Sequence, residues 1–166
     1  MPGWVWILLG AVLVLAPLSW LKPSPRHQRL VRLREVARQL GIKVALTPLK
    51  LDEQVRIPGV AYRWLRAPDA PPLPGYYCWL KADLPQAAGL TECVPGWRQL
   101  NGRDHPLPEA QQLDFWAWVE SLPQDVFALE WGSASFVIWW REGQLEVDLA
   151  GWDAVVRQWL NQSASR

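Results

Sequence analysis

The first twenty-one residues of this chain carry no ionisable side chain, and this stretch constrains the molecule more than any other. From Trp4 to Leu21 every residue is apolar apart from Ser19. At about 1.5 Å per residue, a helix of this length crosses most of a hydrocarbon layer roughly 30 Å thick. The sequence therefore predicts a transmembrane helix over residues 1–21. The residues expected at its two membrane interfaces are Trp4, Trp6 and Trp20.

Two other interpretations of this stretch fit less well. A cleaved signal peptide needs positive charge before its apolar run and a small-residue cleavage site after it. Only Met-Pro-Gly precedes Trp4, and the run ends in "APLSWLKP", so neither feature is present. A helix buried in a globular core would contain far fewer uninterrupted apolar residues.

Charge is distributed unevenly behind the apolar run. Residues 22–50 carry eight basic side chains against Glu35 alone, a balance of +7, whereas residues 51–166 carry nine basic and fifteen acidic side chains, a balance of −6. Positive charge stays on the cytoplasmic side of a bacterial inner membrane. We therefore expect a single-pass inner-membrane protein with a periplasmic N-terminus and a cytoplasmic C-terminal domain, in which Cys78 and Cys93 are free thiols.

The basic segment, residues 22–41, predicts a juxtamembrane helix from Pro25 to Leu40. Ser24 is suited to cap its start and Gly41 to end it. Its arginines are expected to hold anionic phospholipid head groups, each contributing about 1 kcal/mol. The lipid-binding residues predicted in this way are Arg26, Arg29, Arg32, Arg34 and Arg38.

Two alternatives concern the same arginines. They could act only as a topology signal, with their side chains solvated. Nucleic acid is not an expected partner, because the rest of the chain is acidic and the chain is tethered.

The stretch "LKPSPRHQRLVRLREVARQLGIKVALT", residues 21–47, resembles YajC, the small accessory subunit of the bacterial preprotein translocase. The shared plan is an N-terminal span, a Lys-Pro junction, a basic helix, then Leu-Gly and a first strand that contains threonine. This resemblance implies a role beside a membrane machine. It implies no particular site residues.

Residues 42–166 predict one cytoplasmic α+β domain with a mainly antiparallel sheet. Together with the basic helix of residues 25–40, the chain is expected to have about three helices. Helices are expected from about Pro108 to Leu122 and from about Gly151 to Asn161. Residues 83–106 are broken by prolines and glycines and predict a long connection without regular structure. The expected strands are "IKVALTPLKL", "GVAYRWLR", "GYYCWLKA", "DVFALEW", "SASFVIWWRE" and "QLEVDL".

Tryptophan is the compositional outlier of this chain, which has 13 of them. Several of them alternate along the expected strands, so they could form an exposed patch that binds a partner, or be buried in a sheet covered on both faces. The residues concerned are Tyr76, Tyr77, Trp79, Trp139 and Trp140.

Catalytic motifs are absent from the sequence. The sequence has only two histidines and no C-x-x-C or H-E-x-x-H spacing, so it does not indicate a metal site. It also has no glycine-rich nucleotide-binding motif, so it does not indicate a cofactor. Cys93, His105 and Asp104 are the one set that could form a thiol-imidazole site, because they lie close together in residues 83–106. An ordinary polar turn before Pro106 explains Asp104 and His105 better than a catalytic site does.

These observations favour a non-enzymatic function. We expect an accessory or scaffolding subunit whose domain docks on a membrane-associated protein complex while the arginine helix lies on anionic lipid. The expected partner is a membrane or peripheral protein, with a second copy of the chain as another candidate. The alternative is a membrane-tethered enzyme or small-ligand sensor with its site in residues 83–106.

Overall fold

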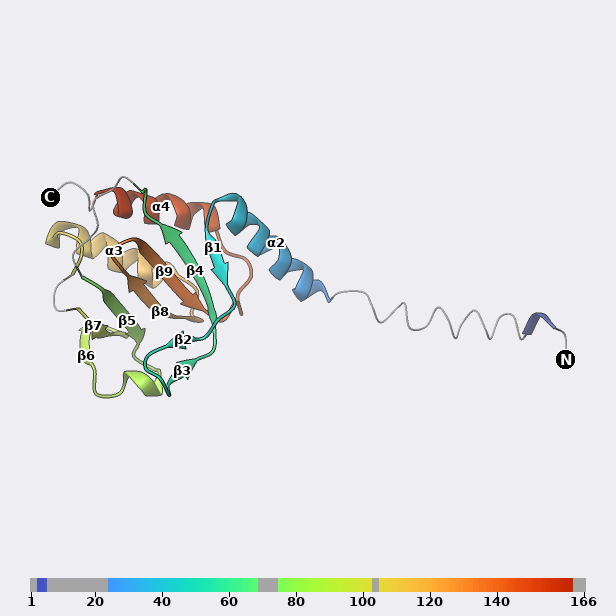
Figure 1. Cartoon of the computed structure of the whole chain (residues 1–166), viewed down its shortest axis with the longest axis horizontal. Coiled ribbons are helices and arrows are strands. Elements are labelled where there is room, and N and C mark those ends of the chain that lie inside the picture. Colours follow the sequence, from blue (N-terminus) through green and yellow to red (C-terminus); the bar gives the residue numbers. More distant parts are fainter. Residues whose placement is uncertain (1–2, 6–23, 69–74, 103–104, 163–166) are drawn as a thin grey trace. The chain divides into compact units, whose positions relative to one another are not determined.

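The computed structural model describes residues 3–5, 24–68, 75–102 and 105–162 of the 166-residue chain (Figure 1). The chain divides into two compact units, residues 1–32 and 33–166. The division falls within the first long helix, α2 (Pro25–Gln39).

The prediction of an N-terminal transmembrane helix in the fold is corrected by the structure. Across the described residues, no helix combines the length and apolar character needed to cross a membrane. Residues 6–23, which make up most of the predicted span, lie outside the described part of the chain.

Helix α2 begins and ends where its flanking residues predict. The Ser24 Oγ accepts a hydrogen bond from the His27 backbone N–H at 3.2 Å, which caps the first turn. Gly41 has a φ of +76°, and the backbone N–H of Ile42 donates to the Ala37 carbonyl at 2.9 Å. This left-handed glycine reverses the chain and satisfies a free carbonyl at the helix end.

Residues 33–162 form an α+β domain around one seven-stranded sheet, in which the strand pairs among the described residues are all antiparallel. A small second sheet pairs β2 (Leu49–Lys50) with β3 (Arg56–Ile57). This confirms the predicted class and the mainly antiparallel sheet. The order of the large sheet is β1 (Lys43–Ala45), β4 (Val60–Leu65), β9 (Ser135–Trp140), β8 (Val126–Trp131), β5 (Tyr77–Lys81), β7 (Trp97–Asn101) and β6 (Thr91–Val94).

Helices cover one face of this sheet. Side chains of α3 (Glu109–Ser121) and α4 (Leu149–Gln162) pack on it together with Leu33 and Ala37 of α2. Phe115 of α3 lies at the centre, with ring-centroid distances of 5.1 Å to Trp159 and 5.9 Å to Trp131. Aromatic rings contribute large buried areas, so they account for much of this core.

The opposite face of the sheet is covered by β2, β3 and the short 3-10 helix η1 (Pro85–Ala87). Because the sheet is covered on both sides, Trp79, Trp139 and Trp140 are buried. Tyr77 is half-buried, and Tyr76 is 43 % exposed. The alternating aromatic residues are therefore mostly core rather than a surface patch.

Three segments differ from the prediction. The first is "IKVALTPLKL" (residues 42–51), which forms two short strands, β1 and β2, in different sheets rather than one strand. Residues 83–106 are largely ordered, because Pro95 and Gly96, whose φ is +83°, form the turn of a β6–β7 hairpin. The segment "QLEVDL" (residues 144–149) forms no strand. Glu142 just before it is buried with a φ of +52°, and Leu145 and Val147 pack on the core without joining a sheet.

Candidate functional site

The predicted lipid-binding arginines fall into two groups. Arg26, Arg29 and Arg32 are exposed in the first part of α2, where no acidic residue precedes Glu35. Their spacing of three residues places them on neighbouring positions of the helix surface. Of the predicted interface tryptophans, Trp4 is 62 % exposed. Trp6 and Trp20 lie outside the described residues.

Arg34 and Arg38 are engaged within the domain. The Arg34 Nε donates to Glu142 Oε1 at 3.0 Å, and its Nη2 donates to Oε2. These hydrogen bonds raise the pKa of Arg34 above its usual value. Arg38 forms a two-bond pair with Glu35, at 2.7 and 3.0 Å, and hydrogen bonding to Arg38 lowers the pKa of Glu35.

Glu142 fixes the segment that follows β9. Its side chain is 5 % exposed and accepts hydrogen bonds from Arg34 and from the Tyr62 hydroxyl, the latter at 2.8 Å. Burial, and then the bond to Glu142, raise the pKa of Tyr62. Glu142 is also the one non-glycine residue with positive φ among the described residues, a strained conformation that these partners hold in place.

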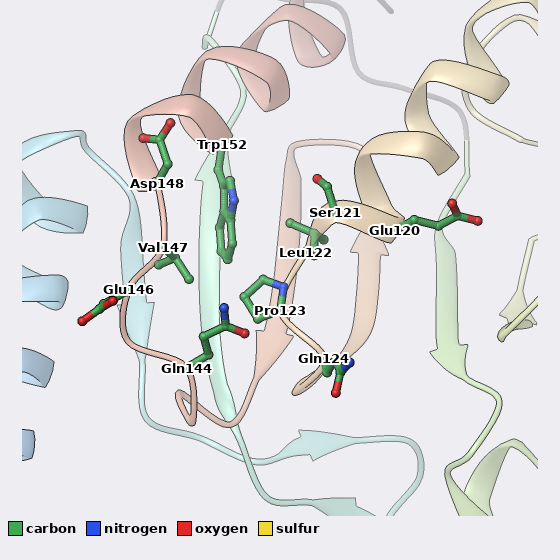
Figure 2. Close-up of a pocket in the computed structure, with 10 residues that line it drawn as sticks. All are labelled: Glu120, Ser121, Leu122, Pro123, Gln124, Gln144, Glu146, Val147, Asp148 and Trp152. Carbon is green, nitrogen blue, oxygen red and sulfur yellow. The ribbon is translucent and has the colours of Figure 1, made fainter.

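A pocket of about 560 Å³ lies beside this fixed segment, between the end of α3 and the start of α4 (Figure 2). Three of its side chains are acidic and none is basic. The residues that line it are Glu120, Ser121, Leu122, Pro123, Gln124, Gln144, Glu146, Val147, Asp148 and Trp152.

The end of α3 forms one wall. The Ser121 Oγ donates to the Trp118 carbonyl at 2.6 Å, and the Leu122 N–H donates to the Val119 carbonyl at 3.2 Å. Pro123 has no N–H to continue the helix, so α3 stops here. The last turn contains no basic residue that would offset the partial negative charge of this helix end.

The start of α4 forms the other wall. Asp148 Oδ1 accepts from the Gly151 N–H at 2.9 Å, which caps α4 and fixes the carboxylate. Trp152 in the first turn is 7 % exposed and packs edge-on against Trp140, with ring centroids 5.6 Å apart. This contact between rings holds the Trp152 indole rigidly in the pocket (Figure 2).

The thiol-imidazole set of the sequence is engaged in other contacts. The Cys93 thiol donates to the Trp97 carbonyl at 3.3 Å, and burial raises its pKa. The His105 ring packs edge-on against Phe115, with ring centroids 4.9 Å apart. Its Nδ1 accepts a hydrogen bond from the Leu107 N–H at 3.1 Å. Burial lowers the pKa of His105 to about 4. Asp104 lies outside the described residues.

Both cysteines are free, as predicted. Cys78 is fully buried, and burial raises its pKa to about 12, which keeps it in the unreactive thiol form at neutral pH. No group of His, Cys, Asp and Glu within the described ranges could hold a metal ion.

Comparison with known proteins gives no relative: no family model, curated protein or solved structure matches this chain. The site therefore has to be interpreted from its own geometry. The alternation of residues 144–149 predicts a strand and gives no sign of an acidic pocket. The available signal was the stretch between Arg141 and Arg157, which has no basic residue and four acidic ones: Glu142, Glu146, Asp148 and Asp153.

Proposed function

We propose that this protein is a membrane-associated accessory or scaffolding subunit at the inner face of a bacterial inner membrane. The first part of α2 lies on anionic lipid, and the α+β domain docks on a membrane or peripheral protein. The observation that carries the proposal is that Arg26, Arg29 and Arg32 are exposed in the first part of α2, which contains no acidic residue before Glu35.

The electrostatics of the helix start support an anionic ligand. The amino-terminal end of a helix carries partial positive charge, so cationic side chains there are unfavourable by a few tenths of a kcal/mol or more. Helix α2 has no acidic residue in its first turn. Phosphate groups are favoured ligands at such an end, and a lipid surface supplies many of them.

Two features of the sequence support a location at a membrane. The run from Trp4 to Leu21 favours an apolar environment over water, whatever structure it adopts there. The resemblance of residues 21–47 to YajC favours a partner among membrane machines. Arg34 and Arg38 are not part of the proposed lipid contact, because Glu142 and Glu35 engage them.

The test is partitioning of the full chain into neutral vesicles and into vesicles that contain anionic phospholipid. We expect stronger partitioning into the anionic vesicles. The triple variant Arg26→Gln, Arg29→Gln, Arg32→Gln should lose most of this preference, because each arginine contributes about 1 kcal/mol near an anionic surface.

A matched control removes three exposed positive charges elsewhere: Lys43→Gln, Lys50→Gln and Arg56→Gln. This variant should keep the preference for anionic vesicles. Equal partitioning of the wild type into both kinds of vesicle, or an equal effect of both triple variants, would contradict the proposal.

A further inference from the structure

Arg66 follows β4 directly and is almost completely buried. The residue is 7 % exposed, and none of its three guanidinium nitrogens is accessible to solvent. No residue in the described part of the chain accepts a hydrogen bond from any of these nitrogens. A guanidinium stays charged in proteins, so the chain cannot relieve this burial by releasing a proton. Buried charges are normally paired, because an unpaired one is strongly destabilising.

The pairing of the sheet places the Arg66 side chain on the face that the helices cover. The Arg66 backbone N–H donates to the Ala134 carbonyl at 2.9 Å, which continues the pairing of β4 with β9 beyond Leu65. Side chains two positions apart on a strand lie on the same face. Trp64 belongs to the core under α3 and α4, so Arg66 lies on that face as well.

The carboxylates that contact this face have other partners. Glu142 accepts from the Tyr62 hydroxyl at 2.8 Å, and Asp153 accepts from Trp64 Nε1 at 3.1 Å. Each of the two carboxylates is also paired with an arginine of a helix. Neither of them is therefore the counter-charge of Arg66.

A second donor without a partner lies at the same end of this face. Trp131 is 1 % exposed, and its Nε1 has no acceptor among the residues that the structure describes. Trp131 is opposite Phe136, and Phe136 is opposite Trp64, which lies two residues before Arg66. Strands β4 and β8 flank β9, so their backbones are about 10 Å apart. A small ligand on this face can therefore lie between the two donors.

We propose that this end of the domain binds a small organic monocarboxylate. The carboxylate accepts two hydrogen bonds from the Arg66 guanidinium, whose planar fork matches its two oxygens, and the Trp131 N–H is a further donor. The apolar part of the ligand lies against the rings of Trp64 and Phe136, whose centroids are 6.4 Å apart. This site is separate from the lipid contact of the proposed function and does not depend on it.

Charge balance favours a monocarboxylate over inorganic phosphate or sulfate. One arginine neutralises one negative charge, and a dianion would leave excess charge among buried aromatic rings. A metal ion would be repelled by the guanidinium. Because the guanidinium nitrogens are not accessible, the ligand enters when this end of the domain opens locally.

The test measures thermal unfolding of the full chain in neutral detergent, with acetate or benzoate added at an ionic strength held constant with chloride. We expect each carboxylate to raise the unfolding temperature in a saturable way, by about 5 °C at a hundredfold excess over its Kd. Phosphate and sulfate should have no comparable effect at low concentration, where non-specific salt effects are small. Equilibrium dialysis with radiolabelled benzoate measures the Kd directly.

Three variants locate the binding at Arg66. Arg66→Met should raise the unfolding temperature of the ligand-free protein, because it removes an unpaired buried charge, and should abolish the response to carboxylates. Arg66→Lys keeps the charge without the planar fork and should raise the Kd for benzoate about tenfold. The matched control Arg63→Met removes an exposed arginine from the same strand and should change neither the response nor the Kd.

Four results would overturn the proposal. The first is an Arg66→Met variant that unfolds at a lower temperature than the wild type or does not fold, because the guanidinium would then have a partner within the chain. The second is a wild type that does not respond to acetate or benzoate. The third is an equal response to phosphate and sulfate, and the fourth is an equal loss of the response in Arg63→Met.

Discussion

At the scale of single residues, Glu142 organises more of the molecule than any other polar side chain that the structure describes. It joins α2 to β4 through Arg34 and Tyr62, and it holds the start of the segment that lines the pocket. A buried carboxylate is tolerated only when its lone pairs are engaged, and here two side chains engage them.

Glu142→Gln should therefore destabilise the domain by about 2 kcal/mol, because the half-buried Arg34 would lose its charge partner at the buried Glu142 site. Urea unfolding monitored by circular dichroism measures this change. The control is Glu35→Gln in the exposed pair with Arg38, where we expect less than about 1 kcal/mol. Equal losses in the two variants would show that Glu142 has no special structural role.

His105 should make stability depend on pH. Burial lowers its pKa in the folded domain to about 4, whereas an unfolded chain takes up the proton near pH 6.5. The unfolded state therefore binds more protons between these values, so stability falls as pH decreases from about 6.5 to about 4, by on the order of 2 kcal/mol.

The variant His105→Asn should flatten this dependence, because asparagine can still accept from the Leu107 N–H but does not titrate. Urea unfolding at a series of pH values between 4 and 7, roughly the window just defined, provides the measurement. Replacing the exposed His27 in the same way should leave the slope in place. An unchanged slope in His105→Asn would contradict the assignment.

At the scale of elements, periodicity and capping predicted most of the fold. The helices α2, α3 and α4 and the strands β4, β5, β8 and β9 lie where apolar patterns and flanking residues place them. These elements have strong local signals, such as Ser24 before α2 and Pro123 after α3. Their pairing order could not be predicted, because it depends on contacts between segments far apart in the chain.

The incorrect predictions also have physical causes, because local sequence patterns do not report contacts between distant segments. The β6–β7 hairpin is short and mostly exposed, so it lacks the apolar alternation that identifies a strand. Residues 144–149 alternate between polar and apolar side chains but form no strand. Leu145 and Val147 pack on the core although this segment does not pair with the sheet. The acidic pocket was missed because its two walls come from segments that are brought together only by the fold.

The β6–β7 turn offers a test of this explanation. Gly96 has a φ of +83°, so Gly96→Ala should lower the free energy of unfolding by about 1 kcal/mol. Gly132 lies in the β8–β9 turn without positive φ, and an added Cβ there would meet only ordinary contacts. Gly132→Ala should be close to neutral. A neutral Gly96→Ala variant would contradict the turn geometry.

At the scale of the whole molecule, opposite charges lie in different parts of the chain. Residues 22–50 have a charge balance of +7 and residues 51–166 one of −6. The proposed lipid contact uses the exposed arginines of residues 24–32, and Arg34 is not part of it because Arg34 pairs with Glu142. Lipid binding and the stability of the domain should therefore depend on separate residues.

Two variants, each measured for vesicle partitioning and for urea unfolding, test this claim most directly. We predict that Arg26→Gln, Arg29→Gln, Arg32→Gln loses most of the preference for anionic vesicles and keeps the free energy of unfolding. We predict that Glu142→Gln lowers the free energy of unfolding and keeps the preference for anionic vesicles. If either variant changed both properties to a similar extent, or if the triple variant kept the vesicle preference, the lipid contact of the arginines would be contradicted.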